Sequence, residues 1–137
     1  MPFEYHRTIH FGDTDAAGVV FFANYLVICH EAYEEALAAA GIDLKTFFSR
    51  HGVVVPISQS HAEYLRPLTC GDKVRVTLAP VALAPDSFAV DYDLYRQGRP
   101  DKLAARVHTE HVCVATRTRR RGSLPPPLAS WIRNPSA

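Results

Sequence analysis

The stretch FGDTDAAGVVFFANY, residues 11–25, is the part of the chain that decides its fold and chemistry. It places two carboxylates, Asp13 and Asp15, in a short turn, followed by a lone glycine, Gly18, and an apolar run. A helix is predicted to begin at about Asn24. A carboxylate that faces a helix N-terminus is suited to attack on an activated carbonyl, because the unpaired N–H groups of the helix can stabilise the oxyanion. The segment therefore predicts chemistry at a carbonyl carbon.

Length and composition limit the possible functions. A chain of 137 residues fits one domain, residues 1–137, and can bury a substantial core. The formal net charge of +1 argues against a general nucleic-acid binder, and no apolar run is long enough to predict a membrane span. The first residues lack the basic-then-apolar pattern of a secretory signal. We expect a cytoplasmic protein that binds neither nucleic acid nor membrane.

The cysteines and histidines do not predict a metal site. Cys29, Cys70 and Cys113 lack metal-ligand spacing and are expected to be free thiols in a reducing compartment. His6 and His10 share a strand face, but four residues of strand separate them by about 13 Å. Most histidines are expected at the surface. No metal ion and no cofactor are predicted.

Hydrophobic periodicity predicts a helix between strands. Residues 3–11 alternate as a strand, and apolar residues recur at helical spacing over 24–40, between Asn24 as N-cap and Gly41 as C-terminal stop. A one-turn helix is expected over 44–50.

The rest of the chain is predicted to be mostly antiparallel strands separated by turn sequences. The expected strands cover 53–65, 73–83, 87–95 and 102–116. The proline-rich residues 122–137 are expected to be an irregular tail with a short turn near 128–132. The pattern indicates an α+β fold, in which a curved antiparallel sheet wraps a long central helix.

Residues 11–25 resemble the signature of hot-dog-fold acyl-CoA thioesterases of the 4-hydroxybenzoyl-CoA thioesterase type. The resemblance to this family extends over nearly the whole chain. Other segments are similar to one branch, the 1,4-dihydroxy-2-naphthoyl-CoA hydrolases of cyanobacterial phylloquinone (vitamin K1) biosynthesis. These segments are CHEAYEEAL (29–37), CGDK (70–73), LAARVHTEHVCVA (103–115) and LPPPLASWI (124–132). The resemblance implies a hot-dog fold, hydrolysis of an aromatic acyl-CoA thioester, and a homodimer that pairs into a homotetramer.

The resemblance also implies roles for residues of the motif. The second aspartate of the family motif is catalytic, which corresponds to Asp15, and the oxyanion contact is a backbone N–H at about Phe22. Gly18 would let the backbone approach the substrate. Many relatives that act on aliphatic acyl-CoA carry a histidine where this chain has Phe22, which favours an aromatic-lined pocket. Asp13 is interpreted as a turn residue, and turn capping is also the alternative reading of Asp15.

The chemistry of a thioester leaves two routes open. A thiol has a pKa of about 8.5, so CoA can depart as a thiolate without a general acid. The carboxylate of Asp15 either attacks the carbonyl to form a mixed anhydride or deprotonates a water molecule. Both routes need only one carboxylate and an oxyanion site.

Three arginines, Arg119, Arg120 and Arg121, belong to the densest positive patch and are candidates for binding the CoA phosphates. A solvated strand end is the alternative reading. Glu31 and Glu63 are weaker candidates for contact with the site. The rival functions are a thioesterase for 4-hydroxybenzoyl-CoA or another acyl-CoA, a hot-dog dehydratase, and a non-catalytic acyl-CoA-binding protein. A dehydratase typically pairs a histidine with its carboxylate, and a binding protein would not require the carboxylate.

Overall fold

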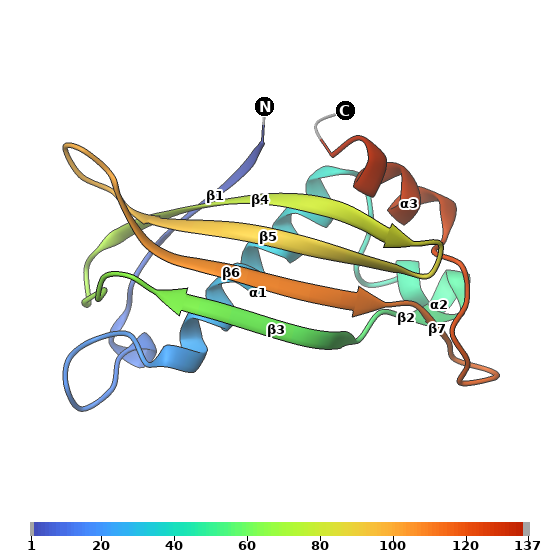
Figure 1. Cartoon of the computed structure of the whole chain (residues 1–137), viewed down its shortest axis with the longest axis horizontal. Helices are drawn as coiled ribbons and strands as arrows, with labels where there is room; N and C mark the ends of the chain where they lie inside the picture. Colours follow the sequence, from blue (N-terminus) through green and yellow to red (C-terminus); the bar gives the residue numbers. More distant parts are fainter. Residues whose placement is uncertain (1, 136–137) are drawn as a thin grey trace.

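A computed structural model describes residues 2–135. It contains a five-stranded antiparallel sheet with strand order β1-β4-β5-β6-β3 (Figure 1). Its strands are β1 (Phe3–Thr8), β3 (Ile57–Tyr64), β4 (Lys73–Ala84), β5 (Ser87–Arg96) and β6 (Lys102–Val112). A separate two-stranded ladder pairs β2 (Val53–Val54) with β7 (Val114–Ala115). The helical elements are a 3₁₀ turn η1 (Phe11–Asp13), α1 (Phe22–Ala39), α2 (Phe47–His51) and α3 (Pro126–Arg133).

The core forms where α1 crosses one face of the sheet (Figure 1). Helix α1 has 18 residues, and its buried side chains recur three and four positions apart, which places them on one face. They are Tyr25, Ile28, Cys29, Ala32, Tyr33, Ala36 and Leu37. Alternate residues of the strands meet them, as the pleat of a sheet requires. On β4 these are Val74, Val76 and Leu78, and on β5 they are Phe88, Val90, Tyr92 and Leu94. The predicted arrangement of a long helix against an antiparallel sheet is confirmed.

Several boundaries differ from the prediction. The strand predicted over 3–11 ends at Thr8, and the strand predicted over 102–116 is divided at Cys113 into β6 and β7. Helix α1 begins at Phe22, and its N-cap is Phe21 with no side-chain capping bond, so the prediction of Asn24 as N-cap is wrong. The Asn24 amide instead donates a hydrogen bond of 2.9 Å to the carbonyl of Asp13. The strand predicted over 53–65 is divided into β2 and β3, with Pro56 between them, because proline has no N–H to donate to a ladder.

The C-terminal segment is more ordered than its composition suggests. Residues 126–133 form the helix α3, with Pro126 in its first turn, where an irregular tail with only a short turn near 128–132 was expected. Proline is tolerated there because the first N–H groups of a helix have no intrahelical acceptor. Leu128, Trp131 and Ile132 are buried and hold the helix against the core.

One arginine joins β1, the turn after it and α1. The Arg7 guanidinium lies 2.8 Å from Asp13 Oδ2 and 3.0 Å from Glu31 Oε1. The backbone N–H of His10 also donates to Asp13, and the Tyr5 hydroxyl donates to Glu31. Burial alone would raise the pKa of Asp13, but the hydrogen bonds from Arg7 and His10 hold that pKa below its usual value. The turn is therefore fixed to the helix that follows it.

One histidine departs from the expected surface position. His111 is only 1% exposed, and its ring stacks on Phe88 with centroids 4.7 Å apart. Its Nε2 lies 2.8 Å from Thr109 Oγ1, whereas Nδ1 has no partner among residues 2–135. Burial lowers the pKa of His111 to about 4, so the ring is neutral in the folded protein near pH 7.

Replacing Asp13 with asparagine is expected to lower the free energy of unfolding by about 2 kcal/mol, because a half-buried Arg7 loses its charged partner. Urea unfolding at neutral pH measures the change. Asp93→Asn is the matched control, since Asp93 and its partner Arg106 are 3.6 Å apart with side chains 42% and 62% exposed. We expect about 0.5 kcal/mol or less for this exposed pair. Equal effects in both variants would contradict the role of the Arg7–Asp13 pair.

The stability of the fold is expected to fall as the pH drops through the range set by His111. The unfolded chain binds a proton at this residue near pH 6.5, and the folded chain only near pH 4. The loss reaches about 3 kcal/mol between these limits. His111→Gln removes the titration, so it should flatten this part of the stability profile in urea unfolding at several pH values. If the free energy of unfolding changes as steeply with pH in His111→Gln as in the wild-type protein, other titrating groups cause the slope.

Candidate active site

Asp15 lies on a tight turn that is held by hydrogen bonds of its own backbone and side chain. Its N–H donates to the carbonyl of Val19 at 2.9 Å, and its carbonyl accepts from the N–H of Gly18 at 3.0 Å. Its Oδ1 accepts from the N–H of Ala17 at 2.8 Å. Gly18 has φ of +84°, a left-handed conformation that favours glycine. No residue among 2–135 bonds to Oδ2, so this oxygen is available to a reacting group.

The start of α1 presents an unsatisfied donor. Phe21, the N-cap, is in an extended conformation and provides no side-chain cap. Its own N–H donates to the carbonyl of Asp13 at 3.0 Å, which joins the helix start to the turn. The N–H of Phe22, the first helical residue, has no acceptor among the described residues. Free N–H groups at a helix start carry partial positive charge and suit a developing oxyanion.

A cleft of about 410 Å³ joins these two features. Asp15 and Phe22 both line it, so the structure brings together the two residues that the motif singled out. The opposite wall comes from the end of β3 and the segment after it. Its residues are Tyr64, Leu65, Arg66 and Pro67. Gly18 does not line the cleft, and its place is in the turn that carries Asp15.

Two residues of this wall were not predicted from the sequence. The Tyr64 hydroxyl donates to the carbonyl of Phe22 at 3.0 Å, and the Tyr64 ring meets Tyr25 edge-on at 5.0 Å. Arg66 donates to the carbonyl of Leu103 at 2.6 Å, and its side chain is a cation at the edge of the cleft. Both residues lie about 40 positions after the motif, and only the folding of β3 beside α1 brings them to it.

The other candidates lie away from the cleft. Arg119, Arg120 and Arg121 are exposed on the loop after β7, and Arg121 is held 3.1 Å from Asp86. Figure 1 shows this loop at the end of the sheet opposite the turn of residues 11–20. Glu31 is engaged by Arg7 and Tyr5, and neither it nor the exposed Glu63 lines the Asp15 cleft. Within one chain, therefore, the arginines do not meet Asp15.

The three cysteines are free thiols that differ in burial. Cys29 and Cys113 are buried, Cys70 is exposed, and none is paired with another cysteine. Burial raises the pKa of Cys29 far above its usual value, which suppresses the nucleophilic thiolate. Among residues 2–135, no group of three or more histidine, cysteine or acidic side chains is arranged to hold a metal ion. No helix in the same range has the length and apolar character needed to cross a membrane.

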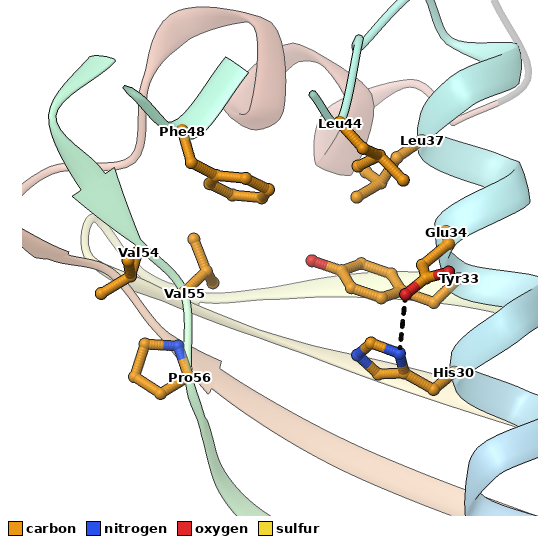
Figure 2. Close-up of a pocket in the computed structure, with 9 residues that line it drawn as sticks. All are labelled: His30, Tyr33, Glu34, Leu37, Leu44, Phe48, Val54, Val55 and Pro56. Atoms are coloured by element: carbon orange, nitrogen blue, oxygen red, sulfur yellow. Dashed lines mark ion pairs between the residues drawn. The ribbon is translucent and has the colours of Figure 1, made fainter. Parts of the chain in front are cut away.

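A second, larger pocket of about 500 Å³ lies beside the middle of α1 (Figure 2). Its walls come from α1, from α2 with the segment before it, and from the chain between β2 and β3. Apolar side chains dominate the lining, which consists of Tyr33, Leu37, Leu44, Phe48, Val54, Val55 and Pro56 with the polar residues His30 and Glu34. His30 Nδ1 lies 3.3 Å from Glu34 Oε1. Neither Asp15 nor the start of α1 lines this pocket.

Comparison with known proteins shows the family of the chain. Residues 9–132 match the family model of the thioesterase-like superfamily. The chain is 48% identical over 131 residues to the 1,4-dihydroxy-2-naphthoyl-CoA hydrolase of Thermosynechococcus vestitus, which covers 96% of this chain and 88% of that protein. It is 45% identical over 130 residues to the hydrolase of the same name from Crocosphaera subtropica, with 95% of both chains covered.

Solved structures give the same relationship. A 1,4-dihydroxy-2-naphthoyl-CoA thioesterase from Synechocystis superposes with a TM-score of 0.91 at 33% identity, over 98% of this chain and 97% of that one. A gentisyl-coenzyme A thioesterase superposes with a TM-score of 0.80 at 26% identity, over 96% of this chain and 99% of that one. The chain therefore belongs to the thioesterase-like superfamily and has its hot-dog fold.

Proposed function

We propose that this protein hydrolyses the aromatic thioester 1,4-dihydroxy-2-naphthoyl-CoA to 1,4-dihydroxy-2-naphthoate and CoA, in phylloquinone biosynthesis. The observation that carries the proposal is the shared cleft of Asp15 and the free N–H of Phe22. Relatives named for this reaction, at 45% to 48% identity over nearly the whole chain, support the choice of substrate. The reaction requires no cofactor in this proposal, and its place is the cytoplasm.

The geometry suggests how the residues divide the work. The thioester carbonyl lies between Oδ2 of Asp15 and the N–H of Phe22. Asp15 attacks the carbonyl carbon, or activates a water that does so, and the negative charge that develops on the carbonyl oxygen is stabilised by Phe22, a contribution of about 3 kcal/mol. The C–S bond breaks and CoA leaves as a thiolate. In the attack route, water then hydrolyses the mixed anhydride and regenerates Asp15.

A second copy of the chain is expected to complete the site. Strand β3 is an edge of the sheet, and all its residues except Ala62 are exposed. Beside it, the apolar side chains of Ile57 on β3 and Val27 on α1 are 43% and 52% exposed. Unpaired edges of this kind invite pairing with another chain. We infer a homodimer joined by antiparallel pairing of β3 with its counterpart, and pairing of two dimers into a homotetramer.

Two-fold pairing would also explain where the arginines act. An antiparallel pair related by a two-fold axis sets the Tyr64 end of one strand beside the partner subunit's Ile57. The partner's α2, β2 and β7 then come close to the Asp15 cleft, and so do the partner's Arg119, Arg120 and Arg121. The CoA phosphates are accordingly proposed to bind these arginines across the subunit seam.

Asp15→Asn is expected to lower kcat by about 10³-fold or more, because it removes the attacking or activating carboxylate. The affinity for a CoA ester, measured by calorimetry, should change little. Asp43→Asn is the matched control: Asp43 Oδ1 also accepts a backbone N–H two residues on, at 3.0 Å, on an exposed turn. Retained hydrolysis in Asp15→Asn would overturn the catalytic assignment. If the wild-type protein binds CoA esters without cleaving any, the chain is a binding protein.

Free-thiol release from a panel of CoA esters tests the substrate. We expect kcat/KM for 1,4-dihydroxy-2-naphthoyl-CoA to exceed that for benzoyl-CoA, 4-hydroxybenzoyl-CoA and aliphatic esters by about 100-fold. Equal kcat/KM values across the panel would support a thioesterase but refute 1,4-dihydroxy-2-naphthoyl-CoA as its specific substrate.

The arginine proposal has its own test. Arg120→Ala combined with Arg121→Ala is expected to raise KM about 10-fold for CoA esters, because charge-assisted bonds to phosphate are lost. Thioesters of N-acetylcysteamine, which carry no phosphate, should be unaffected. An equal rise in KM for both kinds of ester would contradict phosphate binding by these residues.

A further inference from the structure

We propose that Tyr64 positions the oxyanion donor of the Asp15 cleft: its hydroxyl holds the first turn of α1, so that the N–H of Phe22 stays directed at the substrate carbonyl. This inference rests on the proposed thioesterase function. The Tyr64 hydroxyl bonds to the protein backbone and not to the reacting atoms. Tyr64 is therefore a positioning residue, which acts on the rate through Phe22.

The first turn of α1 has few contacts of its own to hold it. Its N-cap, Phe21, provides no side-chain hydrogen bond, and the side chains of Phe21 and Phe22 are exposed. Helix ends without such a cap tend to fray. The buried face of α1 begins only at Tyr25. Hydrogen bonds to neighbouring segments are therefore important for the direction of the first turn.

Two hydrogen bonds tie the helix start to the turn before it, and both end on one atom. The N–H of Phe21 donates to the carbonyl of Asp13 at 3.0 Å, and the side-chain amide of Asn24 donates to the same carbonyl at 2.9 Å. Bonds that share one acceptor fix a single point, and the first turn can still tilt about that point. A further anchor on a different element is needed to fix its direction.

Tyr64 supplies this anchor from the strand across the cleft. It is the last residue of β3, and its hydroxyl donates to the carbonyl of Phe22 at 3.0 Å. A backbone carbonyl has two lone pairs, so this bond is compatible with helical bonding of Phe22. The Tyr64 ring is itself held edge-on against Tyr25 at 5.0 Å, a favourable arrangement for two aromatic rings. Figure 1 shows the end of β3 and the start of α1 at the same end of the sheet.

The direction of the first turn matters because an oxyanion donor acts only at close range. A donor is effective when it lies about 3 Å from the oxygen that becomes charged, and a misplacement of about 1 Å can reduce the rate by about 100-fold. The N–H of Phe22 has no acceptor among residues 2–135, so the direction of the helix start determines where it points. Loss of the Tyr64 hydroxyl should consequently slow the reaction more than it weakens substrate binding.

Tyr64→Phe tests the proposal, because it keeps the ring and removes only the hydroxyl. We expect kcat for 1,4-dihydroxy-2-naphthoyl-CoA to fall about 10-fold, with KM changed by about twofold or less. This division is expected when an interaction stabilises the transition state and not the bound substrate. An unchanged kcat in Tyr64→Phe overturns the proposal.

Two substrate analogues distinguish positioning of the donor from a general loss of binding. A ketone with a methylene group in place of the sulfur imitates the bound substrate, whereas a difluoromethylene ketone hydrates readily and imitates the tetrahedral intermediate. In Tyr64→Phe, the affinity for the second analogue should fall about 10-fold and the affinity for the first by about twofold or less. Equal losses for both analogues would contradict action through the oxyanion donor.

Tyr92→Phe is the matched control. Tyr92 is 2% exposed, its hydroxyl lies 3.4 Å from Thr109 Oγ1, and it does not line the Asp15 cleft. This variant also loses a hydroxyl contact, and urea unfolding measures what that contact contributes to stability. We expect kcat to stay within about twofold of the wild-type value. An equal loss of kcat in Tyr92→Phe would assign the effect of Tyr64→Phe to reduced stability and overturn the proposal.

Amide hydrogen exchange tests the contact independently of the reaction. The N–H of Asn24 donates to the carbonyl of Phe21 at 2.8 Å, within the first turn of α1. We expect this N–H to exchange about fivefold faster in Tyr64→Phe, because the turn opens more often, and at the wild-type rate in Tyr92→Phe. Unchanged exchange in Tyr64→Phe overturns the proposal. Failure of the proposed function is a different result, in which the wild-type protein hydrolyses no CoA ester.

Discussion

The packing of α1 across the five-stranded sheet places the start of the helix beside the turn that carries Asp15. The apolar face of the helix is buried from Tyr25 to Leu37. The start of α1 extends beyond the buried face, to Phe22, which is 61% exposed. The first N–H groups of the helix are consequently presented at the edge of the core, next to the turn that carries Asp15.

The start of α1 at the proposed site departs from the local rules of helix capping. Asn24 is a residue type that commonly caps helices, yet its amide holds the carbonyl of Asp13 and the helix begins before it. The N–H of Phe22, at the first helical position, has no acceptor among the described residues. Natural proteins tend to depart from local preference at functional sites and to compensate elsewhere. Here the compensation is the contact of Arg7 with both Asp13 and Glu31, which ties the turn and the helix together.

Much of this fold follows from periodicity alone. The predicted order of one strand, one long helix and further antiparallel strands is correct, because alternation and helical spacing are strong signals in this chain. The two motif residues Asp15 and Phe22 are also brought into one cleft, as the motif predicts. Of helix α3, only a short turn near 128–132 was predicted, because the three consecutive prolines at 125–127 are typical of irregular structure.

Other features depend on contacts that no local pattern encodes. Tyr64 and Arg66 reach the cleft only because β3 takes the edge position beside β6. The burial of His111 depends on its stacking with Phe88, a residue on the neighbouring strand β5. The separation of Asp15 from the arginines and from the pocket of Figure 2 is likewise a property of the sheet.

The central claim is that the thioester carbonyl lies between Asp15 and the start of α1. A crystal structure with a ketone analogue of 1,4-dihydroxy-2-naphthoyl-CoA, in which a methylene group replaces the sulfur, tests it most directly. The account predicts the carbonyl oxygen at about 3 Å from the backbone nitrogen of Phe22. It also predicts the carbonyl carbon, or a water beside it, within about 3.5 Å of Asp15 Oδ2. A carbonyl bound elsewhere, with Phe22 and Asp15 contacting neither it nor a nearby water, would contradict the account.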